Sequence, residues 1–403
     1  MTSVERHEAR YQRRKLKREQ KRKEFTKSFI NNQNTFGTVS LIKSAKKCKN
    51  GTKWKPSVQA YLANVVINSR RSSKSVLNYT WHTKGFHEFD IVERGKPRHI
   101  KSVNFEERCI QRSLCDTCIT SILSHYLIYD NGATLTEKGT DFALDRLTKH
   151  LHDFYKEYGR CGYIFFFDFS QYFANIDIDI LKSKVSKYIP DSLHRKMYYQ
   201  FIDVFKDSGL GLGSQVSQIS AVFYANELDH LIKDQLGIKY YARYMDDGYI
   251  ILNDLEELKR VIYLIELKCK ELNIILNKKK CQIVPLHKQF RFLKIRFFIT
   301  KIGKVVRRLD RQVSKKERRK LKKFKFYLDT NLLSFNKVYN MFHGWVYSQK
   351  RGKNYNMLKN MIIYFNTTFE HNYITTKPKR SKSMKQYHNI KYLCKICKFT
   401  EAA

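Results

Sequence analysis

The chain has 403 residues, of which 42% are hydrophobic and 14% aromatic, so it can build a sizeable core and two or three domains. Lys and Arg number 78 against 37 for Asp and Glu, which gives a formal net charge of +41. This excess is typical of proteins that bind nucleic acid. The sequence has no long apolar span and no apolar signal core, which argues against a membrane partner, and its nine scattered cysteines are typical of reduced thiols in the cytoplasm.

A basic run extends from Arg6 to Lys27, and neither Pro nor Gly interrupts it, so it can be helical. Few apolar residues would anchor such a helix. Two interpretations remain open, a solvated tail and a helix that grips RNA. Polar sequence continues to about Lys55, and Val58–Asn68 is the first segment that predicts a packed helix.

A β-hairpin is predicted next, because Phe89–Arg94 and Arg98–Val103 flank the turn-forming residues Gly95-Lys96-Pro97. Glu106–Leu127 then has the pattern of a helix. The two segments belong to a region of short strands and helices.

Two pairs of cysteines have the spacing of metal ligands, Cys115 with Cys118 and Cys394 with Cys397. Together they would suffice for one zinc site. Cys115 and Cys118, however, lie at positions i and i+3 on an apolar helix face, where buried thiols are ordinary. The spacing therefore favours packing over zinc.

The run Cys161–Phe167 is continuously apolar, which is typical of a strand covered on both faces. It ends in Asp168, and a carboxylate at the end of a buried strand is costly unless it is paired or binds a metal. Helices are predicted over Asp179–Tyr188 and Arg195–Phe205. The glycine-rich Gly209–Gln218 allows a close backbone approach to a ligand, and an apolar helix follows it.

Tyr244-Met245-Asp246-Asp247 lies between the β-prone runs Tyr240–Arg243 and Gly248–Leu252, which predicts a hairpin with two carboxylates at its tip. Adjacent acids raise each other's pKa unless a cation lies between them. The pair therefore indicates a divalent metal, and a solvated Asp-Asp turn is the alternative.

Beyond this hairpin the pattern predicts a helix over Leu255–Leu272 and strands around Ile274–Val284 and Phe290–Thr300. The alternation favours an α+β fold, a sheet with helices on one face. From Lys301 onward the sequence becomes basic and helical, with helices expected at Arg307–Leu328, Phe335–Tyr347 and Met357–Phe369. The stretch from Thr376 is basic with little apolar content, and we expect a flexible arm.

Asp168 and the pair Asp246 and Asp247 both close β-elements, so they meet at one end of the sheet if those strands are neighbours. Two divalent ions held there would activate a 3′-hydroxyl and stabilise a leaving pyrophosphate. Mg²⁺ suits a site of carboxylates completed by substrate phosphates, with Mn²⁺ as a substitute. The alternative is that three acids happen to lie at strand ends.

The segment Phe167–Asp177 resembles the first catalytic motif of reverse transcriptases of the retron and group II intron type. The resemblance runs over about Lys96–Thr300 and more weakly beyond. It implies that Asp168 is a metal ligand and that Phe173 is the bulky residue that rejects a 2′-hydroxyl, for which core packing is the alternative.

The glycine-rich segment resembles the second palm motif of that family, in which most members have Gln-Gly and Ser-Pro. This chain has Leu212-Gly213 and Ser217-Gln218 instead, as in diversity-generating retroelements, whose enzyme copies a template RNA with errors. Leu212 would replace a polar contact near the templating base.

The resemblance extends to several basic positions that imply contacts with the triphosphate or with the nucleic acid, for which solvated surface charges are the alternative. Lys280 resembles a lysine that can protonate pyrophosphate, although Lys278 and Lys279 are adjacent. Lys294 replaces the usual glycine of a primer-grip hairpin. The remaining positions are Lys96, Arg98 and Arg108 in the first fingers motif and Lys138 in the second.

The resemblance implies a right-hand polymerase with the divisions 1–75 basic N-terminal extension, 76–160 fingers, 161–300 palm, 301–375 helical thumb and 376–403 basic C-terminal arm. Its partners would be template RNA, primer and cDNA, deoxynucleoside triphosphates, and a cognate structured RNA with an accessory protein. Alternatives are a group II intron maturase, for which little sequence remains after the thumb, a retron or phage-defence enzyme, and a non-catalytic RNA-binding scaffold.

Overall fold

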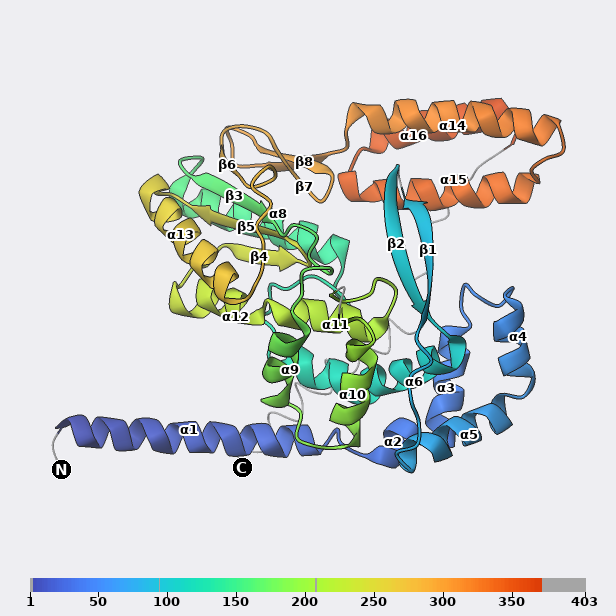
Figure 1. Cartoon of the computed structure of the whole chain (residues 1–403). Coiled ribbons are helices and arrows are strands. Elements are labelled where there is room, and N and C mark those ends of the chain that lie inside the picture. The colour runs from blue at the N-terminus through green and yellow to red at the C-terminus, as the bar shows by residue number, and fades with distance from the viewer. Residues whose placement is uncertain (1–2, 94, 207–208, 372–403) are drawn as a thin grey trace, which may run out of the picture. The chain divides into compact units, whose positions relative to one another are not determined.

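The computed structural model describes residues 3–93, 95–206 and 209–371. The chain forms two compact units, the first made of 1–293 and 297–306 and the second of 294–296 and 307–403 (Figure 1). None of the described helices combines the length and the apolar character that crossing a bilayer requires.

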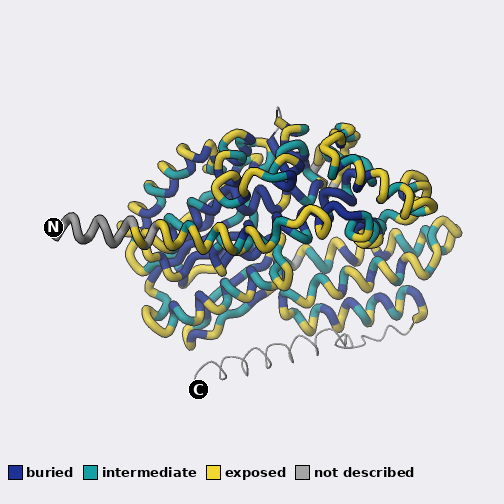
Figure 2. The backbone as a smooth tube through the Cα atoms, turned by 90° about the horizontal axis from the view of Figure 1, so that it is seen from below, coloured by how far each residue is buried: buried dark blue, intermediate teal, exposed yellow. Residues whose placement is uncertain are grey.

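The first unit begins with helices. Their bounds are α1 Ser3–Lys27, α2 Asn32–Phe36, α3 Thr38–Cys48, α4 Pro56–Ala63 and α5 Val65–Leu77. The prediction of a first packed helix at Val58–Asn68 was wrong, because that segment breaks at Asn64 between α4 and α5 and packing begins earlier. Phe36 and Leu41 are already fully buried in the main core. The described side chains of α1 are mostly exposed, as the largely yellow tube that follows the grey stretch at the N-terminus shows (Figure 2).

The predicted hairpin is confirmed, with β1 (Phe86–Glu93) and β2 (Lys96–Val103) paired antiparallel along their whole length. Lys96 and Pro97, which were expected in the turn, belong instead to β2 and pair with β1. The helix expected over Glu106–Leu127 is also present in three consecutive parts: α6 Phe105–Leu114, the π-helical turn η1 Cys115–Ile119, and α7 Thr120–His125. A further helix, α8 (Thr140–Tyr158), leads into the central sheet.

The central sheet is antiparallel throughout and has the strand order β4-β5-β3-β6. Its strands are β3 Tyr163–Asp168, β4 Tyr241–Tyr244, β5 Asp247–Leu252 and β6 Gln282–Pro285. The helices between and after the strands are α9 Ile178–Ser186, α10 Leu193–Asp203, α11 Gln215–Tyr224, α12 Asn226–His230, the π-helical turn η3 Leu231–Gln235, and α13 Leu255–Glu271.

Both faces of this sheet are covered. Phe165 and Phe167 belong to the main core, which contains residues of α9 to α13. Phe166 packs on the other face against Phe290. On that face the hydroxyl of Tyr249 also shares a hydrogen bond with Nδ1 of His150 in α8 at 2.9 Å. The expected α+β fold with its helix-covered palm sheet is confirmed, and the uninterrupted apolar run in β3 follows from burial on both faces.

The remaining elements follow β6 in the chain. A three-stranded sheet has the order β7-β8-β9, with β7 Phe290–Phe292, β8 Ile295–Ile299 and β9 Val305–Arg308. The helices are α14 Arg311–Asp329, α15 Phe335–Gln349, the short 3-10 turn η4 Lys350–Gly352, and α16 Tyr355–Phe369. The three helices that the periodicity predicts are therefore present, and they share a core in which Phe342 and Phe365 stack at 4.2 Å. The basic arm expected from Thr376 lies outside the described residues.

Candidate active site

The hairpin of β4 and β5 is closed by a two-residue turn. Its last pair is Tyr244 with Asp247, so Met245 and Asp246 alone form the loop, which we call the catalytic turn. Met245 has φ +56°, a left-handed conformation that favours glycine. The amide of Phe169 donates to the carbonyl oxygen of Asp246 at 3.1 Å, which fastens the turn to the chain that leaves β3.

The structure brings the three predicted carboxylates to one end of the central sheet. Asp168 lies directly opposite Asp247 in the antiparallel pairing of β3 and β5, and residues paired in this way have their side chains on the same face. Asp246 precedes Asp247 in the catalytic turn. Asp168 is only 4% exposed, whereas Asp246 and Asp247 are half-buried and remain accessible.

The negative charges of these residues oppose one another. Burial, followed by the charges of Asp246 and Asp168 and a hydrogen bond shared with Asp168, raises the pKa of Asp247 to about 7. Burial and the charge of Asp168 also raise the pKa of Asp246. A divalent cation among the three carboxylates would relieve this repulsion.

A loop between α13 and β6 holds Asp168. Lys280 Nζ forms an ion pair with Asp168 Oδ2 at 2.5 Å, and Asn277 Nδ2 donates to Asp168 Oδ1 at 3.3 Å. The amide of Asn277 also donates to the carbonyl oxygen of Asp168 at 2.8 Å. Partial burial alone would lower the pKa of Lys280, but the carboxylate of Asp168 raises it.

This loop explains why the strand expected over Ile274–Val284 was wrong for most of its length. Leu276 makes a single bridge to Phe169, and regular pairing begins only at Gln282. The backbone of the loop forms hydrogen bonds that support Asp168, so it does not form the regular hydrogen bonds of a β-strand with its neighbour.

The donor set fits a hard divalent cation. Asp168, Asp246 and Asp247 supply only oxygen ligands, carry mutually repelling charges and lie beside open space for substrate phosphates. Within 3–93, 95–206 and 209–371, no group of three or more His, Cys, Asp or Glu side chains is already arranged as a ligand set. Asp168 is instead paired with Lys280, so binding of a cation would require small side-chain movements.

A cavity of about 340 Å³ adjoins the carboxylates. Its lining includes the acids Asp168 and Asp247 together with the cations Lys279, Lys280 and Arg291. The combination of acids with basic groups suits a ligand that carries both a metal ion and phosphates.

The glycine-rich segment packs directly on the backbone that follows Asp168. Gly209 has φ +67°, and a Cβ there would lie 2.3 Å from the carbonyl oxygen of Phe173. The amide of Leu210 donates to the same oxygen at 2.7 Å. Phe173 is half-buried and packs against the main core, and the contacts of Gly209 and Leu210 fix its backbone.

A second and larger cavity, of about 780 Å³, gathers three of the residues singled out in the sequence, Arg108, Gly213 and Gln218. Lys47 of α3 and Arg112 of α6 also line it. Gly213 additionally lies near Ile100 of the β1–β2 hairpin, and the preceding Leu212 is half-buried. The N-terminal helices therefore contribute to this polar cavity, which the sequence did not reveal.

Other residues singled out in the sequence lie elsewhere. The motif resemblance also implies that Ser217 and Gln218 contact nucleic acid; Ser217 is completely buried, whereas Gln218 is exposed. Lys138 Nζ donates to the carbonyl oxygen of Tyr129 at 2.7 Å and lies over the rings of Tyr129 and Phe142.

Three further positions concern the hairpins. Arg98 is exposed on β2, and the side chain of Lys96 is outside the described residues. Lys294 is exposed with φ +66°, which explains why a glycine suits this position in related proteins.

The cysteine pair in the helical region is buried. Cys115 and Cys118 are 0% exposed, and burial raises the pKa of both thiols, in the case of Cys118 to about 12. Thiols in this state are poor metal ligands. Cys394 and Cys397 lie outside the described residues.

Some residues support the site without lining it, and the sequence did not predict them. Asn277 is one of them, and the buried pair of Asp229 and Arg243 is another. An arginine two residues before the catalytic turn, inside an otherwise apolar strand, was the available signal, because buried charges need a partner.

The sequence and the structure were compared with known protein families, curated proteins and solved structures. A reverse transcriptase (RNA-dependent DNA polymerase) domain matches residues 86–297, more than half of the chain. No curated protein matches the sequence. Among solved structures, an apo telomerase from Candida tropicalis is 12% identical, with a TM-score of 0.44 over 56% of this chain and 48% of that one. A Candida albicans telomerase in complex with a TWJ fragment of telomeric RNA is 11% identical, with a TM-score of 0.43 over 71% and 62%.

The chain thus spans less than two thirds of the length of those telomerase chains. The family match covers the hairpin of β1 and β2, the three carboxylates and the glycine-rich segment, which are the parts that build the site. The protein belongs to the reverse transcriptase family of RNA-dependent DNA polymerases.

Proposed function

We propose that this protein extends a primer with deoxynucleotides on a template RNA by two-metal nucleotidyl transfer. The observation that carries the proposal is the meeting of Asp168, Asp246 and Asp247 at one sheet end, with raised pKa values at the latter two. A site built only for stability would pair such acids with cations of equal number.

In this proposal Asp168, Asp246 and Asp247 hold two Mg²⁺ ions, for which Mn²⁺ can substitute. Bound ions would lower the pKa of the primer 3′-hydroxyl and stabilise the charge of the leaving pyrophosphate. Lys280, whose side chain is 54% exposed, is free to turn from Asp168 toward the pyrophosphate and donate a proton. Phe173 excludes a sugar that has a 2′-hydroxyl, and Gly209 fixes its backbone.

The template RNA would lie along the larger cavity. Lys47, Arg108 and Arg112 provide positive charge for phosphates, and Gln218 and Gly213 lie at the base of α11. Arg98 of the β1–β2 hairpin would meet the triphosphate. The exposed face of α14 is rich in Lys and Arg and suits the backbone of a template–primer duplex.

We further propose that copying is error-prone, as in a diversity-generating retroelement. This rests on Leu212-Gly213 and Ser217-Gln218, and Leu212 is half-buried where the family usually has a glutamine. A retron or phage-defence enzyme with a cognate structured RNA is the second candidate, favoured by the long basic helix α1. Sequencing of the cDNA against its template separates them, because only the first predicts frequent misincorporation.

Primer extension with Mg²⁺ on a defined RNA template tests the activity. Asp168→Ala and Asp246→Ala should each lose at least about a thousandfold in rate, because each removes a metal ligand. Asp191→Ala is the matched control, since Asp191 is 74% exposed and pairs only with Arg195 among the described residues. Normal polymerisation by a folded Asp246→Ala variant contradicts the proposal and favours the alternative of a non-catalytic RNA-binding scaffold.

The role of Phe173 has its own assay. Phe173→Val replaces the ring with a smaller side chain and leaves the carbonyl oxygen that Leu210 contacts. The variant should accept ribonucleotides that the wild type rejects, measured as the ratio of kcat/KM values for matched deoxynucleotides and ribonucleotides. An unchanged ratio removes Phe173 from sugar selection and leaves it in core packing.

A further inference from the structure

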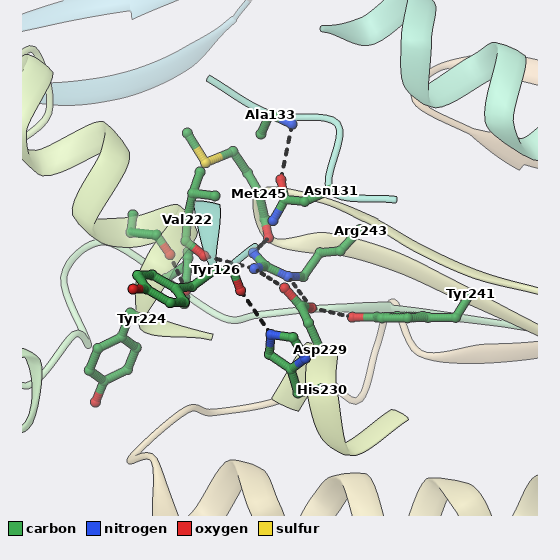
Figure 3. Close-up of polar contacts among 12 residues, drawn as sticks. Tyr126, Asn131, Ala133, Val222, Tyr224, Asp229, His230, Tyr241, Arg243 and Met245 are labelled. Carbon is green, nitrogen blue, oxygen red and sulfur yellow. Dashed lines mark hydrogen bonds and ion pairs between the residues drawn. The ribbon is translucent and has the colours of Figure 1, made fainter. Parts of the chain in front are cut away.

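Arg243 and Asp229 form an ion pair directly behind the catalytic turn, and neither side chain is exposed to solvent. Arg243 is in β4, two residues before Met245, and Asp229 is in α12. Figure 3 shows the two side chains facing one another among buried polar groups. A buried ion pair by itself contributes little net stability, because desolvation offsets the attraction. Its presence therefore calls for another explanation.

The guanidinium of Arg243 makes contacts in three directions. It binds Asp229 in a bidentate manner, with Nε to Oδ1 at 2.8 Å and Nη2 to Oδ2 at 2.6 Å. Nη2 also donates to the carbonyl oxygen of Val222 in α11 at 2.8 Å, and Nη1 donates to that of Met245 at 2.7 Å (Figure 3). One planar group thus connects α11 and α12 with the catalytic turn.

Asp229 is fixed in turn. Its Oδ1 accepts a hydrogen bond from the hydroxyl of Tyr241 at 2.5 Å in addition to the bond from Arg243. The backbone of Arg243 is held as well, because Gly132 donates to its carbonyl oxygen at 2.9 Å. The donor that reaches Met245 therefore has little freedom to move.

The position of this contact matters because of the turn's conformation. Met245 holds a left-handed φ of +56° without being glycine, and such a conformation persists only when its surroundings impose it. Arg243 binds the carbonyl oxygen of Met245, and Phe169 binds that of the next residue, Asp246. The peptide that carries Asp246 is therefore held from both sides.

We propose that Asp229 and Arg243 are a positioning pair that fixes the catalytic turn, and with it the carboxylate of Asp246 relative to Asp168. The role in catalysis rests on the proposed polymerase function. Both side chains are fully buried, so neither is placed to touch substrate or metal. A rigid fork serves this purpose better than a lysine, because one ammonium on a flexible stem cannot reproduce the same set of directed bonds.

Arg243→Lys tests the pair, and Arg146→Lys is the matched control. Arg146 also pairs with a buried aspartate, Asp130, at 2.5 Å, but within the described residues it makes no hydrogen bond or ion pair to the catalytic turn. Arg243→Lys should lower kcat by about 10- to 100-fold with KM for the deoxynucleotide within about twofold, because a displacement near 1 Å at the reacting groups has effects of this size. Arg146→Lys should leave both parameters within about threefold.

Two measurements do not depend on polymerisation. Amide hydrogen exchange in a peptide covering the catalytic turn should be at least about tenfold faster in Arg243→Lys than in the wild type, and unchanged in Arg146→Lys. Binding of Mn²⁺ from MnCl₂, followed by electron paramagnetic resonance, should weaken about tenfold in Arg243→Lys only.

Tyr241→Phe is the mild variant, in case Arg243→Lys does not fold. It removes one hydrogen bond from Asp229 and keeps both charges, so exchange in the turn should rise by about threefold. Unchanged exchange and kcat in folded variants overturn the positioning role. A wild type that does not polymerise overturns the proposed function instead, and the exchange result still decides whether the pair holds the turn.

Discussion

Two clusters of buried charged residues in the first unit differ in the ratio of acidic to basic side chains. At the sheet end, Asp168, Asp246 and Asp247 have Lys280 as the cation within hydrogen-bonding distance, and the pKa values of Asp246 and Asp247 are raised. In the second cluster a single carboxylate, Asp130, is surrounded by cations. Burial alone would raise the pKa of Asp130, but Lys233 at 2.9 Å and Arg146 at 2.5 Å lower it.

The difference indicates which cluster carries chemistry. An acid that is over-supplied with cations is a structural feature, since its charge is already satisfied. An excess of acids at an accessible sheet end destabilises the protein unless a ligand completes it, and that is a property of functional sites. Substitutions should therefore separate the two clusters, with loss of activity at the first and loss of stability at the second.

The largest expected effect is on activity at the sheet end. Asp246→Asn keeps the size of the side chain and removes its charge, so the polymerisation rate should fall by at least about a thousandfold. The free energy of unfolding should not decrease, because a repulsive charge is lost. Rate measurements and urea unfolding on the same preparation check both statements, and a variant that is active or markedly destabilised contradicts them.

The second cluster should respond in the opposite way. Asp130→Asn leaves Lys233 and Arg146 without their buried anion, so the free energy of unfolding should fall by about 3 kcal/mol. The kcat of the folded fraction should remain within about threefold of the wild type. Equal stability of the variant and the wild type would falsify the structural role of Asp130.

His150 provides a pH test of the second cluster. Burial lowers its pKa to about 4, from the ordinary value of 6.5. Above pH 6.5 the imidazole is neutral in both states. As the pH falls below 6.5 the unfolded chain binds a proton that the folded chain does not, so stability decreases by about 1.4 kcal/mol per pH unit. The decrease ends near pH 4, where the folded state also binds the proton.

The variant His150→Gln should remove this contribution. Burial also lowers the pKa of His194 to about 4, so the two histidines together contribute a slope of about two protons in this window, and Asp247, whose pKa is raised to about 7, opposes them by about one. The slope of the unfolding free energy against pH should be smaller in the variant by the equivalent of about one proton, measured by urea unfolding between pH 4.5 and 6. Identical slopes would show that His150 does not stay neutral in the folded protein.

The smallest effect concerns a solvent-facing charge. Arg108→Ala should reduce the slope of log affinity against log salt concentration by about 0.7 for single-stranded RNA, because one phosphate contact is lost. Lys259→Ala is the control, since Lys259 is exposed on α13 and pairs with Glu256. Equal slopes for the wild type and Arg108→Ala place the RNA elsewhere than in the larger cavity.

The sequence predicted those parts of the fold that have local signals. The alternation around Asp246 and Asp247, the apolar run before Asp168 and the glycines around Gly209 were each sufficient to place an element. The meeting of the carboxylates followed from one assumption, that β3 and β5 are neighbours, and their pairing is confirmed.

Other features depend on contacts between distant segments. Lys47 reaches the larger cavity only because α3 packs on α6, and Ser217 is buried because α11 lies inside the core. The loop around Asn277 looks like a strand in sequence, but its backbone supports Asp168. The pairing of Asp229 with Arg243 is equally invisible without the tertiary structure, because an arginine inside an apolar strand indicates that a partner is needed but not which residue it is.

The most direct test of the central claim compares the free energy of unfolding of the wild type and Asp247→Asn with and without Mg²⁺. Without metal the variant should be more stable by about 1 kcal/mol, because the repulsion of the Asp247 carboxylate by Asp246 and Asp168 is lost. Saturating Mg²⁺ should stabilise the wild type by about 1–3 kcal/mol and the variant far less. A variant that is less stable without metal, or equal stabilisation of both proteins by Mg²⁺, would contradict the account of a carboxylate cluster built to hold metal.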